Sequence, residues 1–512
     1  MTKTKRIQIL CLLGAVTLLL SGCWTEAPVE SANGLLGDQE PADQQEEVIL
    51  PAAFTLPYDP DQTLDPVTCA DGMQQVAGSL IYEGLFRLDR QLEPQPWLCQ
   101  SYTYDAASLT YTFTLRSGVT FSDGSPLTAA DAAATLRRAK SSQRYSARLA
   151  HVAAVSAGDG VVIVTLSRPD SSLPALLDIP IVKSGTEESL TPVGTGPYYF
   201  TTDEAGACLA SHSGWWRGES RPAERIALSA ARDREAILYQ FSSHEVQLIT
   251  ADLIGTEPIT ATGNISYEDA DTTVLQFLGF NTARAPFQDS AARRALGLGI
   301  NRETLVSAVL SGHARAAQFP VSPVSPLYPA ELESLYSYDD FAAAMEAAGL
   351  NTGRTRTVTL LVNQENTFKV SAAEHIAQAL SDFDLQIQVE ALPWEEYAAA
   401  LAAGNFDLYY GEVRLPANWD LSALVGTGGS LNYGGWADPQ TEQLLAACAA
   451  AEDRAAALSD LCAYLQQQAP ILPLCFKSSS VLYQTGAVSG LTPTAAEPFD
   501  DLPSCQIHLR QP

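Results

Sequence analysis

The fold class of this chain is decided by residues 357–413, TVTLLVNQENTFKVSAAEHIAQALSDFDLQIQVEALPWEEYAAALAAGNFDLYYGEV. Strand-like and helix-like apolar patterns alternate within this stretch, at residues 357–363, 368–380, 385–392, 394–403 and 406–413. This alternation at short spacing predicts a βαβαβ unit, and hence an α/β fold with a mainly parallel sheet wrapped by helices. Ligands of such sheets bind at the carboxyl ends of the strands, so the segment after Tyr410 is a candidate site.

The N-terminus has the pattern of an export signal. Lys3, Lys5 and Arg6 precede an apolar run that is short for a membrane span and suits the core of a signal peptide. The run ends in Leu-Ser-Gly-Cys23, which resembles the bacterial lipobox, where cleavage precedes a cysteine that then receives diacylglycerol. We expect residues 1–22 to be a lipoprotein signal peptide and Cys23 to be lipidated; the alternative is an ordinary secretory signal. Residues 23–47 are rich in Glu, Gln, Pro and Ala, which predicts a disordered tether.

The chain is strongly acidic. Its 512 residues carry a formal net charge of −29, and loss of residues 1–22 would leave 27 Lys and Arg against 59 Asp and Glu, a charge of −32. Nucleic acid is therefore not an expected partner, because its binding depends on basic residues that neutralise phosphates. Acidity of this kind mainly supports solubility, and it weakly favours cationic or zwitterionic ligands.

The sequence contains no recognisable catalytic or metal-binding motif. Seven cysteines remain after cleavage and lipidation, an odd and widely spread set that predicts no disulfide scaffold, although one or two bridges are compatible with export. The chain has no CxxC, HExxH or GxSxG pattern and no lysine in an SxxK arrangement. We therefore expect no enzyme activity, no catalytic residues, no metal and no cofactor.

Local patterns predict further elements before residue 200. The alternating segment from Tyr111, YTFTLRSGVTF, predicts a strand, Thr128–Asp131 a capping box that opens a helix through Arg137, and residues 161–166 another strand. The stretch TPVGTGPYYF (191–200) has glycines like a phosphate loop, but it lacks a lysine and Pro197 removes an N–H donor. It is better interpreted as a backbone turn that leads into a strand.

Five blocks along the chain resemble one known family, the family-5 solute-binding proteins of bacterial ABC importers for peptides and nickel. These blocks begin IYEGLFRLDRQLEP (within 81–139), TPVGTGPYYF (191–200), FLGFNTARAPFQ (within 277–306), NYGGWADPQTEQLL (432–445) and APILPLCF (469–476). The chain departs from the family pattern at three places: Ser122 replaces a common histidine, Asn301 replaces a common aspartate, and no Asp-Pro follows Asp420.

The resemblance implies a two-lobed periplasmic-binding-protein-like fold of class II, the large peptide-binding type, with an extra α/β subdomain inserted in the N-terminal lobe. Lobe I would comprise residues 48–70, 191–277 and 472–512, the inserted subdomain 71–190, and lobe II 278–471. Hinge strands around Phe277 and Ile471 would join the lobes, and a ligand would bind between them.

The resemblance also implies a function: capture of short peptides outside the cytoplasm for an ABC permease, by a monomer anchored to the cell membrane through its lipid. In peptide-binding members an aspartate in the segment that follows the strand predicted at 406–413 pairs with the peptide's α-amino group, and Asp420 is the matching candidate. Arg414 would receive a carboxylate or neutralise Asp420, whereas Trp419, Tyr433 and Trp436 would line side-chain pockets or pack in the core. The alternatives are a nickel, chelated-metal or oligosaccharide binder, or a lipoprotein that senses peptides or assists folding without its own importer.

Overall fold

The structure is a computed structural model that describes residues 50–69, 72–259, 263–381 and 383–510. The predicted signal peptide, tether and lipidation residue Cys23 lie outside the described residues. Within these ranges, no helix combines the length and the apolar character that crossing a membrane requires.

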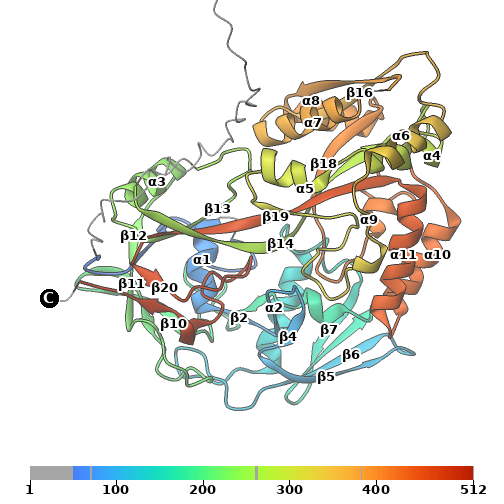
Figure 1. Ribbon diagram of the computed structural model, residues 1–512. Coiled ribbons are helices and arrows are strands. Elements are labelled where there is room, and N and C mark those ends of the chain that lie inside the picture. Colours follow the sequence, from blue (N-terminus) through green and yellow to red (C-terminus); the bar gives the residue numbers. More distant parts are fainter. Residues whose placement is uncertain (1–49, 70–71, 260–262, 382, 511–512) are drawn as a thin grey trace, which may run out of the picture. The chain divides into compact units, whose positions relative to one another are not determined.

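Residues 357–413 form the βαβαβ unit that their periodicity predicts (Figure 1). The unit consists of β16 Arg356–Asn363, α7 Thr367–Ala379, β17 Leu385–Leu392, α8 Trp394–Ala403 and β18 Leu408–Arg414. Strand β16 lies between β17 and β18 and runs parallel to both. Helix α8 is capped by Gly404, whose φ of 67° is left-handed, as is common after the last turn of a helix.

The sheet that contains this unit is not mainly parallel, so that part of the prediction was wrong. Its order is β13-β19-β14-β18-β16-β17, and β15 also pairs with β19. The four strands from outside the unit are β13 Leu248–Ala251, β14 Ile265–Phe280, β15 Ala314–Ala316 and β19 Ile471–Gln484, and all their pairings are antiparallel. The periodicity of residues 357–413 contains no information on strands that join the sheet from elsewhere in the chain.

Strands β14 and β19 form a long antiparallel pair of 16 and 14 residues (Figure 1). Their register shifts between Asp271 and Leu275, where an irregularity of this kind bends a strand. There the Thr272 hydroxyl donates to the carbonyl of Lys477 at 2.6 Å, and the Leu415 N–H donates to the carbonyl of Thr273 at 2.9 Å. The irregular part of the pair therefore lies beside the end of β18.

A second, four-stranded sheet has the order β1-β12-β11-β10. Its strands are β1 Thr55–Tyr58, β10 Tyr198–Asp203, β11 Gly206–Ser211 and β12 Arg225–Ala230. The TPVGTGPYYF stretch enters β10 at Tyr198, which confirms the predicted turn and strand. A Cβ atom at Gly194 would lie 2.1 Å from the carbonyl oxygen of Ile81, so only glycine allows this backbone approach.

A third sheet is antiparallel, with the order β5-β6-β8-β7, and α2 packs on it. The elements are β5 Cys99–Asp105, β6 Thr110–Leu115, α2 Ala129–Ser141, β7 Val152–Ala157 and β8 Val161–Leu166. The capping box of Thr128 and Asp131 is present. The strand predicted from Tyr111 is shorter than expected, because β6 ends at Leu115 and a turn with Gly118 at φ 78° follows.

A buried carboxylate connects segments that are distant in the sequence. Glu83 of the IYEGL motif accepts hydrogen bonds from the indole N–H groups of Trp97, Trp215 and Trp216 and from the Thr195 hydroxyl. Burial raises the pKa of Glu83, while these donors oppose the rise. The short elements nearby in the sequence are α1 Gly72–Ile81, β2 Glu83–Gly84, β3 Phe86–Leu88 and β4 Pro94–Pro96, and β2 pairs with the distant β9 Pro180–Ile181.

The other helices and strands complete the packing. They are α3 Arg234–Ser242, α4 Ser290–Leu298, α5 Arg302–Thr304, α6 Tyr338–Ala347, α9 Ser422–Val425, α10 Pro439–Ala450, α11 Arg454–Gln468, β20 Val488–Ser489 and β21 Gln506–Ile507. Alternate residues of β18 contribute to two different apolar cores, Leu408 and Tyr410 to one and Tyr409 and Val413 to the other. The sheet is therefore covered on both faces. The buried cysteines Cys99, Cys208, Cys448, Cys462, Cys475 and Cys505 are not joined by disulfides.

Candidate ligand-binding site

The end of β18 brings charged side chains to one face of the sheet. Successive residues of a strand point to opposite faces, so Tyr410, Glu412 and Arg414 share a side. Tyr410 is buried and its hydroxyl donates to Gln276 at 2.7 Å, whereas Glu412 and Arg414 are solvent-accessible. The sequence motifs did not point to Glu412. The sequence pattern could have identified it, because two charged residues occupy alternate positions at the carboxyl end of an otherwise apolar strand.

Glu412 is held by two lysines. Its carboxylate lies 3.2 Å from Nζ of Lys369 and 3.3 Å from Nζ of Lys477, and it accepts from the Gln276 amide at 2.9 Å. Burial would raise the pKa of Glu412, but the two lysines and Gln276 outweigh burial and the net shift is downward. Lys477 also pairs with Asp252. These buried lysines come from α7 and β19, and no sequence motif pointed to them.

Asp420 is engaged by an arginine from a distant segment. One carboxylate oxygen lies 2.5 Å from the guanidinium of Arg168, which is 252 residues away in the sequence. The other oxygen accepts from the backbone N–H and the hydroxyl of Ser422, at 2.9 and 2.5 Å. The neutralising partner of Asp420 is therefore Arg168 and not Arg414.

The residues beside this ion pair are closely packed. They line a cavity of about 20 Å³, which has room for roughly one water molecule. Asp170 accepts from the Asn418 amide at 3.0 Å, and burial raises the pKa of Asp170. Arg454 donates to the Asn418 carbonyl, and burial lowers the pKa of Arg454. A ligand group at Asp420 would thus have to displace Arg168 or enter when this contact opens.

The predicted aromatic residues lie in different surroundings. Trp419 is only 2% exposed, has a left-handed φ of 53°, packs edge-on against Phe476, and its indole N–H has no hydrogen-bond partner within the described residues. Tyr433 is more exposed and contacts the ring of Tyr409. Trp436 donates to the Thr441 hydroxyl at 3.1 Å and lies against the Arg293 guanidinium. The rings of Tyr433 and Trp436 therefore contact residues other than Trp419.

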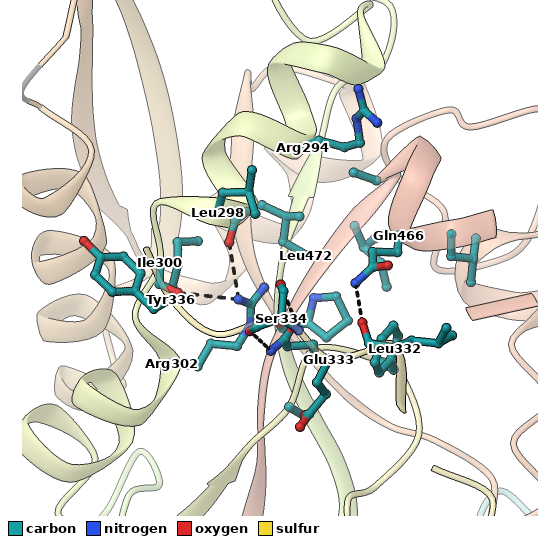
Figure 2. A pocket seen from close by; sticks show the side chains of 18 of the residues that line it. Arg294, Leu298, Ile300, Arg302, Leu332, Glu333, Ser334, Tyr336, Gln466 and Leu472 are labelled. Atoms are coloured by element: carbon teal, nitrogen blue, oxygen red, sulfur yellow. Dashed lines mark hydrogen bonds between the residues drawn. The ribbon is translucent and has the colours of Figure 1, made fainter. Parts of the chain in front are cut away.

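A larger pocket lies elsewhere, lined by residues of α4, α11 and the start of β19 (Figure 2). Its volume is about 640 Å³, within the usual range for small-molecule sites, but it contains none of the predicted site residues. Its central cation, Arg302, donates to the carbonyls of Pro473 at 2.8 Å and Gly297 at 3.3 Å, and burial lowers the pKa of Arg302 to about 10. Because Arg302 already donates to backbone carbonyls of the protein itself, we place the candidate site at the end of β18 and not in this pocket.

No group of three or more His, Cys, Asp or Glu side chains suited to a metal ion occurs in the part of the chain that the structure describes.

Comparison with known proteins identifies a family and several relatives that match most of this chain. Residues 93–432 match the family described as bacterial extracellular solute-binding proteins, family 5. The glutathione-binding protein GsiB of Escherichia coli (strain K12) is 28% identical over 357 residues, which cover 66% of this chain and 69% of GsiB.

Solved structures show the same fold. The nickel ABC transporter structure from Bacillus halodurans has a TM-score of 0.71 and 21% identity, and the match covers 87% of this chain and 98% of that one. The oligopeptide-binding protein AppA from Bacillus subtilis, in complex with a nonapeptide, has a TM-score of 0.61 and 18% identity over 90% and 100% of the two chains. The predicted two-lobed α/β fold is thereby confirmed.

Proposed function

Because the chain belongs to the bacterial extracellular solute-binding proteins of family 5, whose members are binding proteins of ABC importers and not enzymes, we propose that it captures short peptides and delivers them to a membrane permease. The observation that carries the proposal is the family match, which extends from residue 93 to residue 432 and so includes both Arg168 and the end of β18. Relatives named for glutathione and for oligopeptides support a peptide ligand, and one named for nickel supports the main alternative.

Native mass spectrometry of the purified protein tests the ligand class. We expect a bound mass that fragments into amino acids, because enclosed ligands of binding proteins dissociate slowly. A bound nickel complex or an oligosaccharide would replace the peptide proposal with the corresponding alternative.

We propose the lobe boundaries stated above, with lobe I at 48–70, 191–277 and 472–512, the inserted subdomain at 71–190 and lobe II at 278–471. Two observations support these boundaries. All strands of the four-stranded sheet come from the first two segments of lobe I. The two proposed crossings between lobe I and lobe II, at 277/278 and at 471/472, lie within β14 and β19 respectively.

Ligand binding is expected to bring the lobes together. The irregular register of β14 and β19 provides a place where the connecting strands can bend, and enclosure of a ligand favours the closed state by its extra contacts. Small-angle scattering should show a smaller radius of gyration at saturating peptide than without it. Superimposable profiles under both conditions would contradict closure.

We propose that the mature protein is a monomer and that lipid at Cys23 tethers it to the membrane, the tether on the basis of the Leu-Ser-Gly-Cys motif and the polar segment after it. A Cys23→Ser variant should leave the precursor uncleaved or release the protein into the medium, because no thiol is available for the lipid. Partitioning between detergent and aqueous phases measures the change. Equal partitioning of wild type and variant into detergent would rule out Cys23 as the anchor.

A further inference from the structure

The pocket of Figure 2 is a cavity that the proposed peptide site does not use. Its volume is about 640 Å³, and none of the residues that line it belongs to β18. Helices α4 and α6 pack on each other beside it, and short side chains on both helices leave space for a ligand. The apolar wall residues include Ala295 and Leu298 of α4, Ala344 and Ala347 of α6, Leu465 of α11 and Leu472 of β19.

Arg302 brings a positive charge into this apolar wall. Its Nε donates to the carbonyl of Pro473 at 2.8 Å and its Nη1 to that of Gly297 at 3.3 Å, whereas Nη2 has no acceptor among the described residues. The buried Arg293 differs, because all three of its guanidinium nitrogens donate to carbonyls. Burial lowers the pKa of Arg302 to about 10. A charge removed from water is costly unless it is paired, so an anion at Nη2 would be favourable.

The acidic side chains of the pocket do not pair with Arg302. Glu333 accepts from the hydroxyl of Tyr328, and Glu303 is exposed on the one-turn helix α5. Within the described ranges neither carboxylate forms an ion pair with the guanidinium of Arg302. Arg294 is exposed and also lines the pocket, so two arginines balance two glutamates. The lining as a whole therefore does not repel a ligand with a single negative charge.

The rim of the pocket presents apolar side chains to solvent. Leu335 is 95% exposed and Tyr336 is 46% exposed, and both line the pocket. The loop before them is held in place, because the Ser334 N–H donates to the Gln318 side chain at 3.2 Å and the Gln318 amide donates to the Ser334 carbonyl at 2.7 Å. Exposed apolar groups at the mouth of a cavity are typical of a binding surface, and a bound chain would remove them from water.

We propose that this pocket is a second ligand site, for an apolar monocarboxylic acid of the fatty-acid type. The carboxylate accepts from Nη2 of Arg302, and the acyl chain lies against the apolar walls beneath Leu335 and Tyr336. One unused guanidinium nitrogen suits a singly charged head group, and a volume of about 640 Å³ is within the usual range for small-molecule sites. The inference goes beyond the proposed peptide binding and does not depend on it.

Decanoate and decanol are the probes, because they share the alkyl chain and differ in the head group. Equilibrium dialysis against the full-length protein, read by mass spectrometry, should show at least about tenfold stronger retention of decanoate by the wild type, as for one charge-assisted contact. An Arg302→Gln variant should retain both probes equally. Arg294→Gln is the matched control, because it removes an exposed arginine that lines the same pocket and should leave the preference for decanoate unchanged.

A second variant fills the pocket and leaves the bonds of Arg302 in place. Ala291→Trp keeps the cap of α4, since the bond to Asp289 uses the backbone N–H of residue 291. It should lower the retention of decanoate at least about tenfold, because the indole occupies the space of the chain. Ala343→Trp, an exposed position of α6 outside the pocket lining, should not change it.

Three results would overturn the inference. Equal retention of decanoate and decanol by the wild type would show that the head group is not recognised. Unchanged retention of decanoate by Ala291→Trp would place the probe outside this pocket. A preference for decanoate that is lost in Arg294→Gln and kept in Arg302→Gln would show that Arg302 does not bind the carboxylate.

Discussion

An Asp420→Ala variant is expected to bind peptides that have a free α-amino group at least roughly thirtyfold more weakly than the wild type. Truncation of one partner of an enclosed charge pair typically costs about 2–5 kcal/mol, and each 1.4 kcal/mol is about tenfold in affinity. The physical reason is that a buried ammonium without a carboxylate partner is strongly disfavoured. Calorimetry with free and N-acetylated forms of one bound peptide measures the effect: the wild type should reject the acetylated form, and Asp420→Ala should not discriminate.

The ion pair with Arg168 provides the matched control for Asp420. If Asp420 only connects the two segments, Arg168→Gln should weaken binding as much as Asp420→Ala does, because both changes break the same 2.5 Å contact. If Asp420 recognises the amine, Arg168→Gln should preserve discrimination against the acetylated peptide, since the carboxylate remains and has lost a competitor. Equal binding of both peptide forms by the wild type would show that the amine is not recognised.

An Arg293→Ala variant is expected to lower the free energy of unfolding by about 3 kcal/mol or more, because it leaves several buried carbonyls without a donor, at about 1–3 kcal/mol each. Arg293 is 1% exposed and extends from α4 to the end of α11. Its guanidinium donates to the carbonyls of Ala469 at 2.9 Å, Gln468 at 3.1 Å and Phe287 at 2.6 Å. The first two are carbonyls at the C-terminus of α11, where a cation also interacts favourably with the helix dipole.

The adjacent Arg294 gives a direct comparison, because it is exposed on the same helix. Arg294→Ala should change the free energy of unfolding by no more than about 0.5 kcal/mol, as for most surface substitutions. Denaturant unfolding of both variants measures the difference. Similar midpoints for Arg293→Ala and the wild type would mean that water replaces the guanidinium at the end of α11, and would contradict the assigned role.

Local sequence patterns were sufficient to predict the helices and strands whose apolar residues follow a clear periodicity. Strands β17 and β8 and helix α8 have the predicted bounds, and β16, α7 and β18 differ from the prediction by one or two residues at their ends. The capping box at Thr128 was likewise predictable, because its hydrogen bonds join residues three apart. Each of these features depends on contacts within a few residues, or on which face of an element is apolar.

The candidate site was less predictable, because it depends on which distant segments meet. Proximity in sequence suggested Arg414 as a partner for Asp420, but the tertiary structure places Arg168 there, and residues from α7, β18 and β19 surround Glu412. Trp419, predicted either to line a side-chain pocket or to pack in the core, lies in the core with a left-handed backbone in the loop after β18.

The sequence by itself determined the α/β class, the order of the elements in residues 357–413 and the position of the strand end that carries Glu412 and Arg414. Only the tertiary structure decided that β14 and β19 enter the same sheet antiparallel, and that Arg168 and two lysines occupy the carboxylates of Asp420 and Glu412. The physical reason is that periodicity records whether a side chain faces a core or solvent. The partner of a charged group is instead chosen by long-range packing between segments such as those of Arg168 and Asp420, which are 252 residues apart.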